Sequence, residues 1–226
     1  MAIATTQKVS YFVTGTDTGV GKTLVSTALL HALAKRHHRV AGMKAVAAGG
    51  VLIDGIFVNE DVLALRAAST CRVSAELDNP VRLREPVSPH LAARLDSVRI
   101  DIAHIARCHQ QLLALADAVI VEGAGGFLVP LSDSTTGADL AVALGLPVVL
   151  VVGLRLGCLN HALLTAEAIA ARGLSLAGWV ANQIDPAMLA QAENIAYLAH
   201  RLAAPLLGVV PYQRLPDATK IALDLP

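Results

Sequence analysis

Short apolar runs alternate along the chain with segments in which apolar residues recur at helical spacing. The runs are rich in Val, Ile and Leu and cover residues 9–13, 39–46, 118–121, 147–152, 176–181 and 206–210. Several lack polar alternation, which is typical of strands buried on both faces of a parallel sheet. Apolar residues at helical spacing predict helices near 102–116 and 188–202. The pattern predicts an α/β fold: a doubly wound, mostly parallel sheet flanked by helices.

Composition narrows the class of protein. A chain of 226 residues with 54% hydrophobic content can bury one sizeable core, so we expect a single domain over 1–226. Lys and Arg together number 18 and balance 18 Asp and Glu, without a basic block, which argues against a nucleic-acid surface. The three cysteines form no Cys-x-x-Cys pair, so neither a disulfide framework nor a zinc site is indicated. Without a leader or a membrane-length apolar run, we expect a cytoplasmic protein with no membrane partner.

A glycine-rich stretch carries the strongest chemical signal. It runs from Gly15 to Thr23 (GTDTGVGKT), follows the first apolar run and opens an Ala/Leu-rich helical segment. A strand, a glycine-rich turn and a helix N-terminus together make a phosphate cradle, in which Lys22 reaches the β- and γ-phosphates and Thr23 binds Mg²⁺. The first glycine of the general motif is displaced by one position, since Thr16 stands where glycine is expected. The alternative is an ordinary βα turn with a surface lysine.

Three acidic or basic side chains follow other predicted strands or open a helix. Lys44 lies in the second apolar run, where it is either a second cation for a phosphoryl group or a solvated lysine. Asp61 stands near a helix start, where it either binds Mg²⁺ or favours the positive helix end beside an Asn59 cap. Glu122 ends a buried strand before three glycines, a place where P-loop enzymes put a carboxylate on the metal.

A fourth loop, residues 153–161, connects a strand to an Ala/Leu-rich helix. Free amides at that helix start can hold a carboxylate, whereas the alternative is that Asn160 only caps the helix. Cys158 lies in the same loop. Nothing in the sequence points to an activated thiol, so a packed cysteine is the simpler interpretation.

These residues together resemble one family. The matching strings run in order through nearly the whole chain, and several are far more specific than a generic P-loop: residues 11–23 (YFVTGTDTGVGKT), 42–44 (GMK), 85–90 (EPVSPH), 121–126 (VEGAGG), 157–161 (GCLNH) and 178–182 (GWVAN). They resemble the dethiobiotin synthetases of biotin biosynthesis. The resemblance implies that ATP and Mg²⁺ drive closure of a cyclic urea from diaminopelargonic acid and carbon dioxide, through a carbamate and a carbamic-phosphoric anhydride.

The resemblance also implies roles for particular residues. Lys22, Lys44 and Thr18 are expected to be catalytic, and Thr23, Asp61 and Glu122 to hold Mg²⁺. The nucleotide is expected to contact Thr16, Asp17, Thr18, Gly19, Val20, Gly21, Lys22, Thr23, Glu122, Gly123, Ala124, Gly125, Asn182, Gln183, Pro211, Tyr212 and Gln213. The substrate is expected to contact Lys44, Ala48, Ser88, Gly157, Cys158, Leu159 and Asn160. In this family the segment 157–160 is supplied by the other subunit, so a homodimer with a shared substrate site is expected.

The chain departs from the family pattern at two positions. The family commonly has Lys-Pro-Val followed by a Ser or Thr that contacts the substrate, whereas this chain has Ala45 and Ala48. The missing hydroxyl removes a hydrogen bond with a typical net value of about 1 kcal/mol. Two other functions remain open at this point: a related P-loop amide ligase, and a partitioning-type regulatory ATPase, which the lack of a basic patch or amphipathic tail disfavours.

Overall fold

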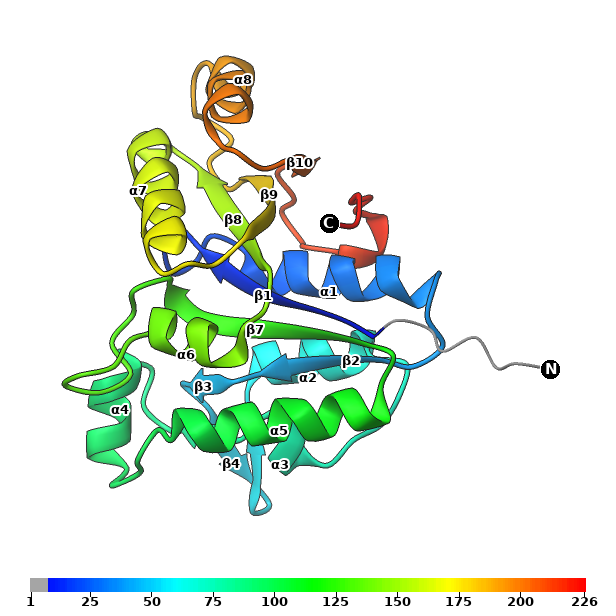
Figure 1. Cartoon of the computed structure of the whole chain (residues 1–226), viewed down its shortest axis with the longest axis vertical. Coiled ribbons are helices and arrows are strands. Elements are labelled where there is room, and N and C mark those ends of the chain that lie inside the picture. Colours follow the sequence, from blue (N-terminus) through cyan, green and yellow to red (C-terminus); the bar gives the residue numbers. More distant parts are fainter. Residues whose placement is uncertain (1–7) are drawn as a thin grey trace.

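The core of the molecule is a six-stranded parallel sheet. The computed structural model describes residues 8–226. The strands follow one another across the sheet in the order β10-β9-β8-β1-β7-β2, and every neighbouring pair is parallel (Figure 1). Their bounds are β1 (Val9–Gly15), β2 (Val40–Lys44), β7 (Ala118–Gly126), β8 (Val148–Leu154), β9 (Leu176–Gln183) and β10 (Leu206–Val210). The predicted doubly wound parallel sheet is confirmed.

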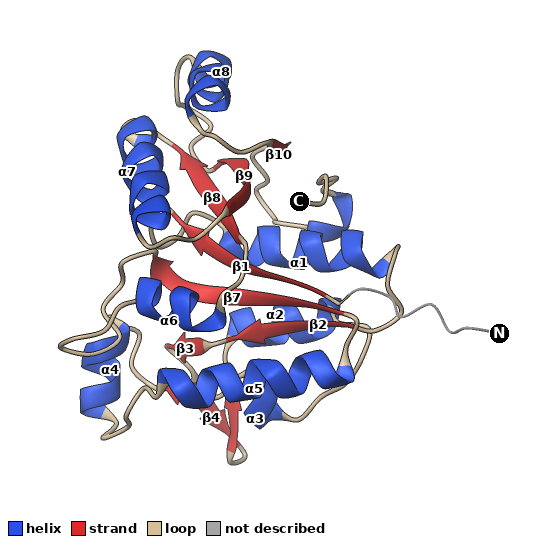
Figure 2. Cartoon of the chain, viewed as in Figure 1, coloured by secondary structure: helices blue, strands red, loops and turns tan. Residues whose placement is uncertain are grey.

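Helices cover both faces of this sheet (Figure 2). One face packs against α1 (Lys22–Ala34), α2 (Glu60–Ala68) and the segment around the 3₁₀ helix η1 (Ala218–Lys220). The other face packs against α5 (Ile102–Leu115), α6 (Gly137–Leu144), α7 (Cys158–Ala171) and α8 (Gln191–Arg201). Phe12 and Val13 of β1 enter opposite cores, as successive strand residues do. Burial on both faces explains why these strands read as continuous apolar runs.

The chain between β2 and α5 forms an irregular layer beside the sheet. Strand β3 (Val46–Ala48) pairs in parallel with β6 (Val81–Leu83), and β4 (Val51–Ile53) forms an antiparallel hairpin with β5 (Ile56–Val58). Two short helices, α3 (Ala75–Asp78) and α4 (Pro89–Leu95), complete this layer. The layer places Ala48 and the start of α4 near the carboxyl end of β2.

Two predicted strand boundaries are wrong. The run 39–46 was expected to form one strand, but the chain leaves the central sheet at Ala45 and continues as β3 beside β6. An apolar run does not reveal that its two halves pair with different neighbours. The strand that contains the run 118–121 was expected to end at Glu122, but β7 continues to Gly126, because Gly126 still pairs with Gly15 of β1.

The described part of the chain, residues 8–226, includes no helix that combines the length and the apolar character needed to cross a bilayer.

Candidate functional site

The glycine-rich turn joins β1 to α1 at the carboxyl edge of the sheet. Gly21 is the N-cap of α1 and adopts a left-handed conformation with φ 87°, and no side chain of the described residues caps the helix. The first-turn amides therefore face outward, where an anion can accept their hydrogen bonds. The Lys22 ammonium folds back over the turn and donates to the Asp17 carbonyl oxygen at 3.0 Å. The local geometry is that of a phosphate-binding loop.

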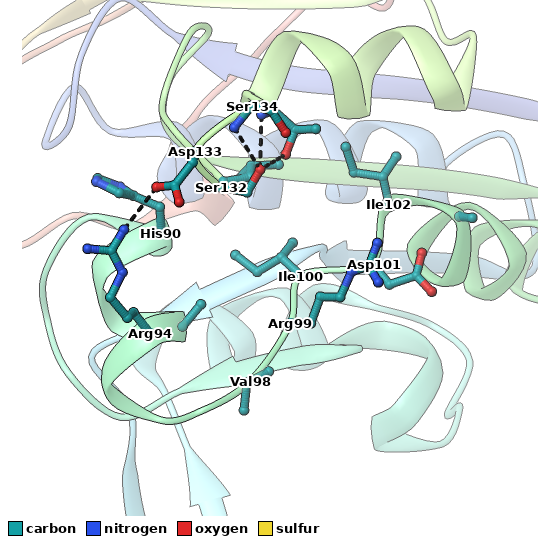
Figure 3. Close-up of a pocket in the computed structure, with 14 residues that line it drawn as sticks. His90, Arg94, Val98, Arg99, Ile100, Asp101, Ile102, Ser132, Asp133 and Ser134 are labelled. Atoms are coloured by element: carbon teal, nitrogen blue, oxygen red, sulfur yellow. Dashed lines mark hydrogen bonds and ion pairs between the residues drawn. The ribbon is translucent and has the colours of Figure 1, made fainter.

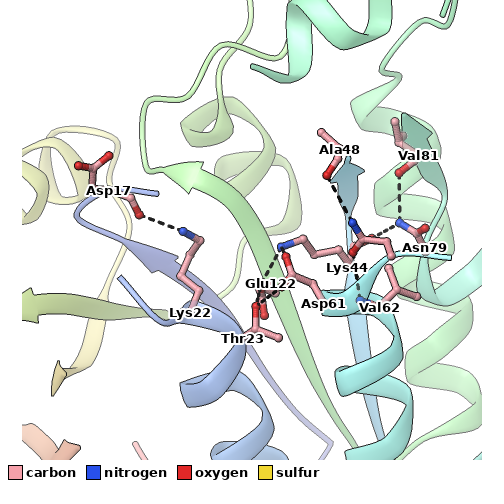
Figure 4. A network of polar contacts seen from close by, with 11 residues as sticks. Asp17, Lys22, Thr23, Lys44, Ala48, Asp61, Val62, Asn79, Val81 and Glu122 are labelled. Atoms are coloured by element: carbon pink, nitrogen blue, oxygen red, sulfur yellow. Dashed lines mark hydrogen bonds and ion pairs between the residues drawn. The ribbon is translucent and has the colours of Figure 1, made fainter. Parts of the chain in front are cut away.

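Four polar side chains meet beside this turn (Figure 4). Lys44 Nζ lies 2.6 Å from Asp61 Oδ2 and 2.6 Å from Glu122 Oε1. The Thr23 hydroxyl oxygen lies 2.7 Å from Asp61 Oδ1 and 2.9 Å from Glu122 Oε1. Glu122 is fully buried and Lys44 is 5% exposed. The structure thus brings together four residues that the sequence places on β2, α1, α2 and β7. We call them the cation cluster.

Strand register and helix capping position the cation cluster. Lys44 of β2 stands opposite Glu122 of β7, which itself stands opposite Val13, two residues before the glycine-rich turn. Asp61 lies in the first turn of α2, whose N-cap Asn59 accepts a hydrogen bond from the Val62 amide. The predicted Asn59 cap is therefore confirmed, and it does not compete with a role for Asp61, because the cap holds that carboxylate toward Lys44.

Burial and charge set the ionisation of the cluster. Burial disfavours a charge on Lys44, but the carboxylates of Glu122 and Asp61 outweigh this effect and raise the pKa of Lys44. Burial likewise disfavours the charged Asp61 carboxylate, but the Lys44 ammonium, the Thr23 hydrogen bond and the Lys22 charge together outweigh it and lower the pKa of Asp61. Burial lowers the pKa of Lys22 to about 8, and repulsion from Lys44 adds to that shift. The interpretation of Lys44 as a solvated strand-end lysine is wrong.

The oxygen atoms of the cluster fit a divalent cation. Asp61, Glu122 and the Thr23 hydroxyl supply hard oxygen donors, and Mg²⁺ is typically held by one or two carboxylates together with substrate phosphates. Glu122 Oε2 is buried and has no hydrogen-bond partner among the described residues. A buried carboxylate oxygen without a partner is costly, so it marks the side of Glu122 from which a cation would gain most.

A cavity of about 440 Å³ opens on one side of the cluster. Four of the residues expected to act on the substrate line it, namely Thr18, Lys44, Ala48 and Ser88. Its remaining walls include Asp61, Pro86, Val87, Pro89, Ala124, Gly125 and Val129. The cavity therefore joins the glycine-rich turn, the cation cluster and the segment that precedes α4. Val129 was not singled out from the sequence, and Pro86 and Val87 were noted only as part of the string 85–90, without a role at the site.

The carboxyl end of β9 contacts the glycine-rich turn, and the end of β10 lies beside the end of β9. Asn182 is 4% exposed, and its side-chain amide donates to the Val20 carbonyl oxygen at 2.8 Å. Gln183 Oε1 accepts a hydrogen bond from the Tyr212 amide at 3.3 Å. Pro211, Tyr212 and Gln213 follow β10 directly. The residues expected around the base are thus neighbours in space, although they lie at the ends of two different strands.

The segment 157–160 lies elsewhere. It forms the start of α7, with Gly157 as N-cap in a left-handed conformation, and none of its residues lines the cavity described above. The alternative that Asn160 caps the helix is wrong, because Asn160 lies inside α7 and is exposed. Cys158 is 2% exposed and carries a free thiol, in agreement with a packed cysteine.

Two residues that support the site were not predicted. Asn79 is buried, and its side-chain amide donates to the Lys44 carbonyl oxygen at 2.8 Å and to the Val81 carbonyl oxygen at 3.1 Å. It thereby fixes the chain where Lys44 leaves β2. The guanidinium of Arg155 forms an ion pair with the Asp17 carboxylate of the glycine-rich turn. An Asn-Pro pair is an ordinary turn signal, so the sequence gives no sign of this role for Asn79. Nothing in the sequence links Arg155 to Asp17.

A second cavity of about 440 Å³ lies between α4, the start of α5 and the loop 131–135 (Figure 3). Arg94 pairs with Asp133 across its mouth at 2.9 Å, and Ser132 Oγ accepts hydrogen bonds from the amides of Ser134 and Thr135. None of the residues predicted to bind nucleotide, metal or substrate lines this cavity. It is separate from the cation cluster.

The fold and the site together define a P-loop nucleotide-binding protein. Its parallel sheet carries a Gly-Lys-Thr turn at the carboxyl end of β1, and the cation cluster lies beside that turn. The AAA domain family model (AAA_26) matches residues 9–220. The ATP-dependent dethiobiotin synthetase BioD of Aromatoleum aromaticum is 54% identical over 97% of this chain and 98% of its own length. The enzyme of the same name from Janthinobacterium sp. is 54% identical over 94% of this chain and 93% of its own length. The chain belongs to the dethiobiotin synthetase family.

Solved structures with the same fold are more distant. The cell division protein FtsY of Thermotoga maritima superposes with a TM-score of 0.55 at 17% identity. That match covers 93% of this chain but only 63% of the FtsY chain. The signal recognition particle receptor FtsY of Elizabethkingia anophelis, solved with GDP, gives a TM-score of 0.53 at 16% identity, over 98% of this chain and 62% of its own. These likenesses concern the fold alone.

Proposed function

We propose that this protein closes the ureido ring of dethiobiotin from diaminopelargonic acid and carbon dioxide at the expense of ATP. One observation carries the proposal: the phosphate-binding turn and the cation cluster meet at the mouth of a single cavity lined by Thr18, Lys44, Ala48 and Ser88. A reaction that joins a phosphoryl group to a bound small molecule needs this adjacency. The 54% identity to two dethiobiotin synthetases supports ring closure as the particular reaction.

The chemistry proceeds in three steps. One amine of the substrate adds to carbon dioxide and loses a proton to give a carbamate. A carbamate oxygen attacks the γ-phosphorus of ATP, the bond to the bridging oxygen breaks, and ADP leaves. The second amine then attacks the carbonyl carbon of the carbamic-phosphoric anhydride and loses a proton, inorganic phosphate departs, and the cyclic urea remains. Each step is favoured by holding the reacting groups in fixed orientation against the walls of the cavity.

Two lysines neutralise charge in this scheme. Lys22 lies on the phosphate-binding turn and stabilises the β- and γ-phosphates together with the amides of residues 16–23. Lys44 projects from β2 toward the cavity and is suited to the carbamate and the transferring phosphoryl group, where negative charge develops. Thr18 lines the same cavity and supplies a hydroxyl there. Ser88 supplies a second hydroxyl to its lining, whereas Ala48 contributes only a methyl group.

The metal in this proposal is Mg²⁺, held by Thr23, Asp61 and Glu122. When bound, it neutralises the charge on the β- and γ-phosphates. The buried, unpartnered Oε2 atom of Glu122 and the convergence of the three oxygen donors support this assignment. On the other side of the turn, Asn182 and Gln183, with residues 211–213, surround the adenine.

The protein works as a homodimer in this proposal, with the start of α7 from one subunit completing the substrate site of the other. Two observations support it. Gly157 and Asn160 are exposed and lie away from the cavity of their own chain. The neighbouring Leu156 is 95% exposed and so presents an apolar side chain that a partner subunit could cover. The amides of the first turn of α7 suit the carboxylate of the substrate.

The decisive experiment is an assay of the purified protein with ATP, Mg²⁺, bicarbonate and diaminopelargonic acid. We expect release of phosphate that depends on the diamine, together with one cyclic urea per phosphate detected by mass spectrometry. Omitting the diamine gives the background. Phosphate release that is stimulated by DNA or lipid vesicles but not by the diamine would refute the proposal and favour a partitioning-type ATPase.

A further inference from the structure

Lys44 contacts the same two carboxylates that the proposed function assigns to the metal. Its ammonium lies 2.6 Å from an oxygen of each, so both are direct, charge-assisted hydrogen bonds. Lys22 carries a similar charge nearby, but its ammonium contacts the Asp17 carbonyl oxygen. The ammonium of Lys44 therefore offsets part of the charge of the carboxylate pair by direct contact.

The cation cluster has fewer protons than its close oxygen contacts need as hydrogen bonds. The Thr23 hydroxyl has one proton, yet its oxygen lies within 2.9 Å of carboxylate oxygens from both Asp61 and Glu122, so one of these two contacts lacks a proton. Glu122 Oε2 also has no partner within residues 8–226. The ammonium thus satisfies the cluster only in part. A divalent cation would meet Thr23, Asp61 and Glu122 without needing a proton at any of them.

An ammonium and a divalent cation cannot share these oxygens at the same distance without strong repulsion. The ammonium of Lys44 can move into the neighbouring cavity, because Lys44 lines that cavity together with Thr18, Ala48 and Ser88. Its backbone would not need to move, since β2 is paired with β7 and Asn79 holds the Lys44 carbonyl. Rotation of a four-carbon side chain is enough to carry the ammonium from the carboxylates to the cavity.

We propose that Lys44 is a built-in placeholder for the metal. It pairs with Asp61 and Glu122 until Mg²⁺ enters with the nucleotide, and the incoming cation then releases the ammonium into the substrate cavity. The carboxylates thereby have a cation in contact at both stages, and the ammonium of Lys44 enters the cavity only when the metal is in place. This inference rests on the proposed metal role of Thr23, Asp61 and Glu122, and its tests omit the diamine and bicarbonate, so they do not depend on ring closure.

The first test measures Mg²⁺ affinity without nucleotide by isothermal titration calorimetry. Lys44→Met removes the competing ammonium, and we expect it to bind Mg²⁺ about tenfold or more tightly than the natural chain. Lys22→Met is the matched control, because it removes a nearby charge that does not contact the carboxylates. We expect it to change the affinity about threefold or less. Equal tightening in the two variants would reduce the effect to general electrostatics and overturn the proposal.

The second test follows thermal unfolding with and without Mg²⁺ at constant ionic strength. Lys44→Met should lower the melting temperature, because it leaves the buried Glu122 carboxylate and the partly exposed Asp61 carboxylate without an ammonium partner, and Mg²⁺ should restore most of the loss. Arg66→Met is the control, because Arg66 lies on the same helix as Asp61. The variant breaks the 2.6 Å ion pair between Arg66 and the buried carboxylate of Asp78. That variant should be destabilised without recovery in Mg²⁺. Recovery of neither variant, or of both alike, would contradict the placeholder role.

A third test uses the natural chain and remains decisive if Lys44→Met fails to fold. Lys44 is 5% exposed, so it should react slowly with an amine acylating reagent, as quantified by mass spectrometry. With ADP present throughout, adding Mg²⁺ should increase acylation of Lys44 severalfold relative to ADP with a chelator. Exposed Lys35 supplies the internal reference. Unchanged reactivity of Lys44 would show that the metal does not displace it.

Discussion

The side-chain amide of Asn182 is hydrogen-bonded to the carbonyl oxygen of Val20 at 2.8 Å, which ties the end of β9 to the phosphate-binding turn. The same amide nitrogen lies where a side chain on Gly21 would have to be, since an ideal Cβ there would stand 2.1 Å from Asn182 Nδ2. The residue proposed to read the base therefore also shapes the turn that holds the phosphates.

Gly21→Ala should accordingly weaken ATP binding by about tenfold or more. The substitution places a methyl group against Asn182 and forces a left-handed φ of 87° on alanine, which alone costs about 1 kcal/mol. ATP affinity measured by calorimetry checks this expectation. Gly19→Ala is the control, because Gly19 also has a left-handed φ of 74° but a Cβ there would meet nothing within 4 Å. Equal losses in both variants would show that the contact with Asn182 is unimportant.

Replacing each lysine should separate nucleotide binding from turnover. Lys22→Ala should weaken ATP binding and turnover together, because it removes the cation on the phosphate-binding turn. Lys44→Ala should lower kcat with the diamine by about 100-fold without weakening ATP binding. Steady-state kinetics combined with direct ATP titration distinguish the two. An equal loss of ATP affinity in both variants would contradict the separate roles.

Ala48→Ser should lower the KM for the diamine. Ala48 lines the cavity, and a hydroxyl there adds one hydrogen-bond partner, with a net value of about 1 kcal/mol, or about fivefold in KM. The KM for ATP should not change. Ser88→Ala removes a hydroxyl from the same cavity and should shift the KM for the diamine in the opposite direction. A KM that is unaffected by either change would place the amines elsewhere.

His109 should make the protein less stable in mild acid. It is 4% exposed on α5, its Nε2 lies 2.9 Å from Ser10 Oγ, and burial lowers its pKa to about 4 from 6.5. The unfolded chain therefore binds the proton more tightly, so stability is complete above about pH 6.5 and falls toward pH 4 by up to about 3 kcal/mol. Denaturant unfolding between pH 4 and 7 measures this loss. His109→Gln should flatten the dependence, whereas His104→Gln, an exposed site on the same helix, should not.

The central architecture could be predicted because the relevant signals are local. Uninterrupted apolar runs indicated buried parallel strands, and the Gly15 to Thr23 turn carries its own strand and helix. The break at Ala45 could not be predicted in the same way, since it depends on β6 being available as a partner for β3. The Ala45 amide donates weakly to the Glu122 carbonyl oxygen at 3.4 Å, a contact that the proline common in this family could not make.

Among the site residues, Lys44, Asp61 and Glu122 could be named from the sequence, but their direct contacts could not. The pairing of Lys44 with Glu122 is set by the register of β2 on β7, which no periodicity specifies. The ion pair between Asp17 and Arg155 joins two loops far apart in the chain, so neither residue signals the other. The assignments to nucleotide, metal and substrate remain predictions that the experiments above test.

The position of β1 in the sheet has a consequence for how the protein is made. This strand carries the phosphate-binding turn and is synthesised first, yet it lies between β7 and β8, which come from the second half of the chain. Such long-range parallel pairing is slow to form, because distant segments must meet before any contact stabilises them. During translation, Lys22 and Lys44 are therefore synthesised well before Glu122, the carboxylate that pairs with Lys44. A partly synthesised chain contains both lysines of the site but lacks its buried carboxylate.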